Sequence, residues 1–165
     1  IIGLILIFGL LLGQNFSHLA EYYKKISPMN YICAKETRDE FISRYVGSYP
    51  AMQFVNKHTP ENSHVRLIFL AGRGYYLDRT YEDSPDMGMS FIRGLAKAAT
   101  GETSFQKYLH SSGYTHLLVR TDLFHSFVHD NYPETKTLLI ERIAETMDVL
   151  YRQNGYAVYQ IHKNI

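Results

Sequence analysis

The chain has little of what usually reveals a function directly. Of its 165 residues, one is cysteine (Cys33) and none is tryptophan, so no disulfide can form within it. With 17 basic and 16 acidic residues its formal net charge is +1, which excludes the strongly basic footprint of a nucleic-acid-binding protein. The sequence has no G-x-S-x-G motif and no phosphate-binding P-loop. We therefore expect one globular domain with a short appendage and no self-contained catalytic site.

The appendage is the apolar stretch at residues 1–13, which reads IIGLILIFGLLLG. It is shorter than the about 20 residues that span a bilayer. A signal peptide would have a basic segment before this stretch and a small-residue cleavage site after it, and neither is present. A buried core helix is the other alternative. Because residue 1 is not methionine, we interpret residues 1–13 as the end of a transmembrane helix that starts upstream.

Residues 14–26 continue this helix with the pattern of a membrane interface. Apolar residues recur there at helical spacing, with polar residues between them: Phe16, Leu19, Tyr22, Tyr23 and Ile26. Tyrosine and lysine are enriched where a helix leaves the hydrocarbon. The prediction is therefore that residues 1–26 form the end of a transmembrane helix with an interfacial segment, and that residues 27–165 form a soluble α/β domain. Lys24 and Lys25 leave the orientation open because Glu21 lies beside them.

Two helices are predicted at the start of the α/β domain. Thr37 and Glu40 have the spacing of a capping box, in which each side chain bonds the backbone of the other, so a helix should cover residues 38–46. Pro50 suits the first turn of a second helix at residues 51–57.

The chain is organised around the apolar run at residues 65–71, VRLIFLA. A short run without polar alternation is typical of a strand that is buried on both faces of a parallel sheet. Further strands are predicted at residues 80–83, 115–119 and 156–161, with helical patterns between them, the longest from residue 133 to about 154. This alternation predicts a three-layer, Rossmann-like α/β sandwich with a mostly parallel sheet of about four strands. The last strand is short, which also suits an antiparallel edge.

The turn after residues 65–71 is the strongest candidate for a ligand site, because ligands bind at the carboxyl ends of strands in open α/β sheets. Gly72 and Gly74 open a dinucleotide-binding fingerprint, but Leu77 stands where the third glycine belongs, so nucleotide binding is not favoured. The arginines supply positive charge, and the tyrosines offer flat faces to a sugar ring. The candidate ligand-binding residues are Gly72, Arg73, Gly74, Tyr75, Tyr76 and Arg79. The alternative is that the glycines only permit the turn and the tyrosines only fill space.

His125 and His129 are the candidate metal ligands, since residues four apart share one face of a helix. The alternative is an exposed loop with two unrelated histidines. We assign no catalytic residue and no cofactor to this chain.

Several segments together resemble a family of membrane enzymes. They are residues 36–41 (ETRDEF), 49–51 (YPA) with Asn56, 65–70 with 73–79 (RGYYLDR), and 113–119 (GYTHLLV), which follow the hydrophobic stretch in this order. This order resembles the C-terminal soluble part of multispanning glycosyltransferases that use lipid-phosphate-linked sugars, the dolichyl-phosphate-mannose–protein mannosyltransferase-like and aminoarabinose-transferase-like enzymes of bacteria.

The resemblance implies an integral protein of the cytoplasmic (inner) membrane whose C-terminal, periplasmic domain lies on the extracytoplasmic side. It implies that the catalytic carboxylates and a divalent-metal site belong to membrane helices upstream, so the present domain is not itself catalytic. Its partners would be the membrane part of its own chain, a polyprenyl-phosphate sugar and an acceptor. Two alternatives stay open, namely a membrane-tethered Rossmann-like ligand-binding module and a small metal-dependent enzyme that uses His125 and His129.

Overall fold

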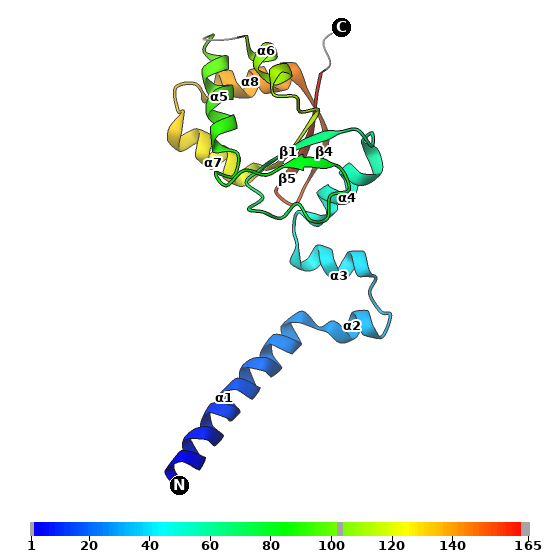
Figure 1. The fold of residues 1–165 in the computed structure, drawn as a ribbon, viewed down its shortest axis with the longest axis vertical. Coiled ribbons are helices and arrows are strands. Elements are labelled where there is room, and N and C mark those ends of the chain that lie inside the picture. The colour runs from blue at the N-terminus through cyan, green and yellow to red at the C-terminus, as the bar shows by residue number, and fades with distance from the viewer. Residues whose placement is uncertain (1, 102–103, 163–165) are drawn as a thin grey trace. The chain divides into compact units, whose positions relative to one another are not determined.

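The computed structural model describes residues 2–101 and 104–162. The chain divides into two compact units, Ile1–Tyr45 and Val46–Ile165. The first contains only helices, and the second contains all five strands of the described residues (Figure 1).

The first unit consists of α1 (Ile2–Ile26), α2 (Pro28–Ile32) and α3 (Arg38–Tyr45). Helix α1 ends at Ile26, and Ser27, which follows it and precedes Pro28, has a positive φ of 47°. The capping box of α3 is confirmed. The Thr37 amide donates to Glu40 Oε2 at 2.8 Å, and the Glu40 amide donates to Thr37 Oγ1 at 3.2 Å. These two bonds satisfy amides that the first turn of a helix leaves without backbone partners.

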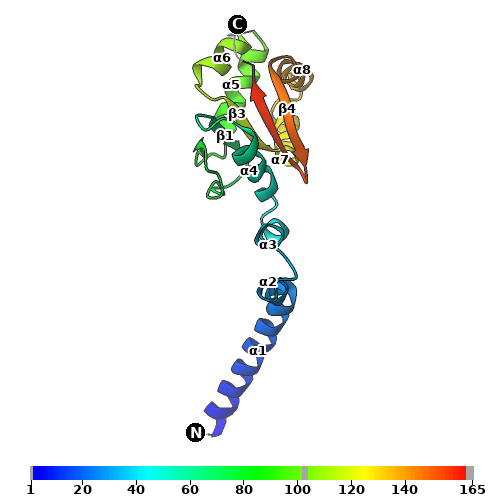
Figure 2. The same ribbon diagram turned by 90° about the vertical axis from the view of Figure 1, so that its right-hand side faces the viewer.

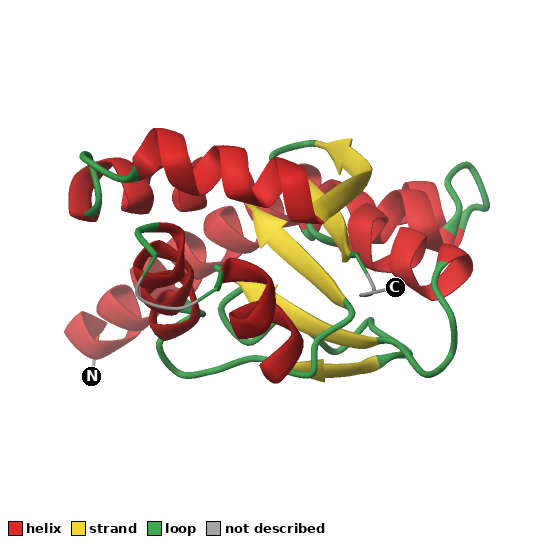
Figure 3. Ribbon diagram, turned by 90° about the horizontal axis from the view of Figure 1, so that it is seen from above, coloured by secondary structure: helices red, strands yellow, loops and turns green. Residues whose placement is uncertain are grey.

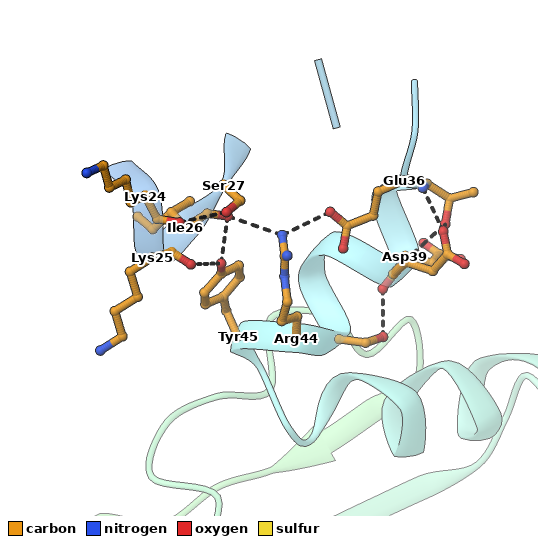
Figure 4. A network of polar contacts seen from close by, with 11 residues as sticks. Lys24, Lys25, Ile26, Ser27, Glu36, Asp39, Arg44 and Tyr45 are labelled. Carbon is orange, nitrogen blue, oxygen red and sulfur yellow. Dashed lines mark hydrogen bonds and ion pairs between the residues drawn. The ribbon is translucent and has the colours of Figure 1, made fainter. Parts of the chain in front are cut away.

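Helix α3 also binds the carboxyl end of α1, as Figure 4 shows. The Tyr45 hydroxyl donates to the carbonyl oxygens of Ile26 at 2.7 Å and Lys25 at 3.0 Å. Arg44 Nη2 donates to the Ile26 carbonyl at 3.1 Å and to Glu36 Oε2 at 2.9 Å. Carbonyls in the last turn of a helix have no partner within the helix. Side chains of α3 therefore cap α1 and join the three helices into one unit.

This capping explains where the chain divides. The sequence places the start of the α/β domain at residue 27, whereas the compact units meet between Tyr45 and Val46. Residues 27–45 belong with α1 because their hydrogen bonds return to its last turn. In the part of the chain that the structure describes, no helix has the length and hydrophobicity needed to cross a membrane.

The second unit is built on one sheet of five strands in the order β2-β1-β3-β5-β4. The strands are β1 (His64–Ile68), β2 (Thr80–Glu82), β3 (His116–Arg120), β4 (Met147–Gln153) and β5 (Tyr156–Ile161). Strand β1 pairs in parallel with β2 and β3, while β5 pairs antiparallel with β3 and β4. Figure 2 shows β4 and β5 as adjacent arrows that point in opposite directions.

Helices cover both faces of this sheet (Figure 3). They are α4 (Tyr49–His58), α5 (Met89–Ala99), α6 (Phe105–Ser111), α7 (Thr121–Asn131) and α8 (Lys136–Thr146). Helix α4 packs Met52 and Val55 against Leu67 of β1. Helices α5 to α8 contribute to a separate apolar cluster that contains Ile68. Neighbouring residues of β1 thus enter different cores, because successive side chains of a strand point to opposite faces.

The prediction of an α/β domain is confirmed, but the prediction of about four mostly parallel strands is wrong. The sheet has five strands, and its antiparallel half comes from a hairpin. Residues 147–153, which the sequence assigns to a long helix, form β4. Asn154 and Gly155 have φ values of 51° and 78°, which suits the tight turn of a β-hairpin. The last strand is antiparallel as considered, but it lies inside the sheet rather than at its edge.

Candidate functional site

Near its start, the loop that follows β1 has three residues with a positive φ, which is uncommon for residues other than glycine. Phe69, Ala71 and Gly72 have φ values of 61°, 53° and 75°. The Phe69 amide donates to the Met87 carbonyl at 2.9 Å, and the Gly72 amide donates to Asp83 Oδ2 at 2.7 Å. These bonds hold the loop against the segment that precedes α5.

Arg79 and Gly74, two of the predicted ligand-binding residues, have structural roles. Arg79 Nη2 donates to the carbonyl oxygens of Asn56 at 2.6 Å and Thr59 at 2.9 Å, which neutralises the carboxyl end of α4. Gly74 is buried, and a side chain at this position would collide with the ring of Tyr81. For these two residues the structure favours the alternative that they shape the turn.

Tyr76 is also held in place. Its ring meets the ring of Tyr49 edge-on, with 4.8 Å between centroids. Its carbonyl accepts from Asn56 Nδ2 at 2.8 Å, while Asn56 Oδ1 accepts from the Asp78 amide at 2.9 Å. Asn56 therefore bonds the loop on both sides and fixes its shape, while the half-buried Tyr76 ring packs on Tyr49.

The remaining predicted residues form an exposed surface, which we call the loop surface: Gly72, Arg73 and Tyr75. Tyr75 is 61% exposed and leans on Tyr76, with 4.4 Å between ring centroids. The Arg73 amide donates to the Leu70 carbonyl at 3.3 Å. The Arg73 side chain makes no hydrogen bond or ion pair with any described residue, so its guanidinium is free to bind an anionic or hydroxyl-bearing ligand.

His125 and His129 lie exposed on α7. The exposed-loop alternative for this stretch is wrong, because residues 121–131 form a helix that buries Phe124 and Val128. Within residues 2–101 and 104–162, no group of three or more histidine, cysteine, aspartate or glutamate side chains is arranged to hold a metal ion.

Sequence reasoning missed a buried charged residue, Arg66. Its side chain is 3% exposed and forms an ion pair with Glu82 of β2. Arg66 Nη2 also donates to Ser84 Oγ at 2.6 Å, and the Tyr114 hydroxyl donates to the second Glu82 oxygen, Oε2, at 2.5 Å. Burial and this hydrogen bond raise the pKa of Tyr114 to about 12, so its hydroxyl stays a donor at neutral pH. The available signal was one arginine inside an otherwise apolar run.

A hollow of about 380 Å³ opens beside this ion pair. We call it the Arg66 pocket, and its lining residues are Arg66, Glu82, Ser90, Phe91, Tyr108, Ser111, Ser112 and Tyr114. Its volume lies within the roughly 300–1,000 Å³ of small-molecule sites. The pocket lies between the β1–β2 edge of the sheet and helices α5 and α6.

Comparisons with protein-family models, with curated proteins and with solved structures found no match to this chain. The functional proposal therefore rests on the residues themselves and on their geometry.

Proposed function

We propose that this chain is the non-catalytic, extracytoplasmic C-terminal domain of an integral-membrane glycosyltransferase that transfers a sugar from a polyprenyl-phosphate carrier. The order of segments between residues 36 and 119, which resembles that of such enzymes, suggests this class. In this proposal α1 lies in the membrane, and the second unit contacts substrate without performing the chemistry.

The observation that carries the proposal is the apolar surface of α1. Its large apolar side chains from residue 7 to residue 19 are 51% to 72% exposed: Ile7, Phe8, Leu10, Leu11, Leu12, Phe16 and Leu19. Apolar surface in water costs roughly 25 cal/mol per Å², and contiguous exposed patches of this kind mark contact with lipid or with other protein segments. Tyr22, Tyr23, Lys24 and Lys25 follow, as they would where a helix leaves the hydrocarbon.

The loop surface supports a role in substrate binding. Arg73 offers a free guanidinium, and Tyr75 offers an exposed ring. Together these groups suit a phosphate-linked sugar, because guanidinium binds phosphate through paired hydrogen bonds and an aromatic face packs on a sugar ring. The framework behind them is held by Asn56 and Arg79, so the two side chains are presented from a fixed loop.

The position of the domain can be tested through Cys33, which is exposed and is the single cysteine of the chain. In intact spheroplasts, a membrane-impermeant maleimide is expected to label Cys33 as fully as it does after lysis. A Cys33→Ser variant of the same protein controls for other labelling. Labelling that requires lysis would place the domain on the cytoplasmic side and contradict the proposal.

Replacing Arg73 by alanine is expected to lower sugar transfer from a polyprenyl-phosphate donor in membrane vesicles by about tenfold. A hydrogen bond to a charged group contributes about 1.5–3 kcal/mol, and 1.4 kcal/mol corresponds to a factor of ten. Arg93→Ala is the matched control, because Arg93 is an exposed arginine of α5 outside the loop. Equal activity of both variants, or a loss in Arg73→Ala that follows loss of folding, would leave the loop without a functional role.

A further inference from the structure

The Arg66 pocket contains a charge pair that is already in position before any ligand arrives. Both terminal nitrogens of Arg66 are occupied, by Glu82 and Ser84, and both carboxylate oxygens of Glu82 are occupied, by Arg66 and Tyr114. Arg66 is almost fully buried, whereas the Glu82 side chain is 52% exposed. The pair is therefore fixed at the floor of the hollow with a net charge of zero, and the remaining lone pairs of the half-exposed Glu82 carboxylate can still accept hydrogen bonds.

Aromatic rings form the walls of the pocket. The centroid of Phe91 lies 5.7 Å from that of Tyr108 and 5.6 Å from that of Tyr114. The Arg66 guanidinium carbon lies 5.9 Å and 5.6 Å from the Phe91 and Tyr114 centroids, respectively. These contacts fix the rings and the guanidinium together, because cations are attracted to aromatic faces.

Gly94 allows the Tyr108 side chain, part of the pocket wall, to approach α5 closely. It lies inside α5, where glycine costs about 1 kcal/mol relative to alanine. A side chain at Gly94 would collide with the hydroxyl end of Tyr108. Burial raises the pKa of Tyr108, so its hydroxyl stays neutral beside α5. The glycine is therefore explained by the approach of Tyr108, which places a neutral ring along the pocket.

Two serine hydroxyls also line the Arg66 pocket. Ser111 and Ser112 lie at the carboxyl end of α6 and donate to carbonyl oxygens of their own helix at 2.9 Å and 2.5 Å. A hydroxyl oxygen that donates in this way still has lone pairs that accept. The pocket thus combines neutral hydroxyls and aromatic faces with a compensated ion pair.

The hydroxyls, aromatic faces and ion pair of the pocket favour one class of ligand over the others. A phosphate or carboxylate would meet the Glu82 carboxylate, and like charges at contact distance repel. An apolar ligand would displace water from the half-exposed Glu82 carboxylate and offer it no hydrogen bond in return. A neutral sugar ring has hydroxyls that donate and accept at its edge and carbon–hydrogen faces that pack on aromatic rings.

We propose that the Arg66 pocket binds one neutral pyranose ring. The inference deepens the proposed function and rests on it for one point, which is that the sugar belongs to the glycan handled by the enzyme. The residues that would contact the ring are Arg66, Glu82, Tyr108 and Tyr114, with Ser111 at the entrance.

The test is saturation-transfer nuclear magnetic resonance on the complete chain of 165 residues. The protein is kept in amine-oxide micelles, which contain neither sugar nor phosphate. The probes are the methyl glycosides of glucose, galactose and mannose, and the comparison ligands are sorbitol and inorganic phosphate. We expect saturation transfer to at least one glycoside, with a dissociation constant of about 1 mM, which corresponds to about −4 kcal/mol.

Three variants locate the binding. Ser111→Trp fills the entrance from an exposed position and should abolish saturation transfer, whereas Lys107→Trp, an exposed position of the same helix that does not line the pocket, should leave it unchanged. Tyr114→Phe keeps the ring but removes the hydrogen bond that holds Glu82 in place. It should weaken binding by about fivefold, because ordering the Glu82 carboxylate would then oppose binding by about the free energy of one hydrogen bond. If Ser111→Trp fails to fold by circular dichroism, Tyr114→Phe decides.

The pyranose proposal is overturned if no glycoside receives saturation, if sorbitol or phosphate binds as well as the glycosides, or if binding survives in a folded Ser111→Trp. These outcomes are separate from those of the proposed function, because they are measured on the purified chain and do not depend on the side of the membrane or on sugar transfer.

Discussion

Replacement of Glu82 by alanine is expected to lower the free energy of unfolding by about 3 kcal/mol. Removing one partner of a buried ion pair typically costs about 3–5 kcal/mol because the remaining charge stays buried and uncompensated. Arg66 is only 3% exposed, so water compensates its charge poorly once Glu82 is removed. Urea unfolding monitored by near-ultraviolet circular dichroism of the 14 tyrosines is a suitable measurement, since the chain has no tryptophan.

The control for this prediction is the double variant Arg66→Met/Glu82→Ala. It removes the buried charge together with its partner, so it should be more stable than Glu82→Ala alone, and the two substitutions should not be additive. Glu61→Ala changes an exposed glutamate that forms no ion pair with any described residue, and it should alter stability by less than about 0.5 kcal/mol. Additive effects at Arg66 and Glu82 would mean that the pair contributes no coupling energy.

Ile68→Ala and Leu67→Ala are each expected to destabilise the second unit by about 2–5 kcal/mol, the range for truncating a fully buried aliphatic side chain. Both side chains are completely buried, and they belong to different apolar clusters on the two faces of the sheet. Losses of similar size at neighbouring positions would show that β1 is covered on both faces.

Thr80→Ala is the control for β1, since β2 is a neighbouring strand with all three of its residues exposed. It should cost less than about 0.5 kcal/mol. A loss below about 1 kcal/mol at either Ile68 or Leu67 would contradict the double-sided core. The same urea unfolding measurement serves all of these variants.

The missed strand β4 shows the limit of reading periodicity alone. Met147 and Leu150 continue the helical spacing of the preceding residues, so the pattern favours one long helix up to Asn154. The same residues also fit a strand, and an asparagine–glycine pair serves both as a helix end and as a hairpin turn. The choice is made by β5, whose backbone groups pair with those of β4 across the turn.

The candidate site, too, was only partly evident from the sequence, because some of its residues are fixed by contacts with distant parts of the chain. The sequence indicated the loop at the carboxyl end of β1, where Arg73 and Tyr75 are exposed. It did not separate these residues from Arg79, whose partners Asn56 and Thr59 lie 20 or more positions away in the chain. Its one signal for Arg66, an arginine inside an apolar run, did not reveal the ion pair, because the partner, Glu82, lies on a different strand.

The sequence by itself determined the α/β class, the positions of β1, β2, β3 and β5, and the start of α3. Each of these follows from interactions between residues close along the chain, such as the apolar run of β1 or the Thr37–Glu40 capping box. The tertiary structure decided the direction of the β4–β5 half of the sheet, the burial of Arg66 and the residues that are free in the loop. These depend on which distant backbone and side-chain groups satisfy one another's hydrogen bonds once water is excluded.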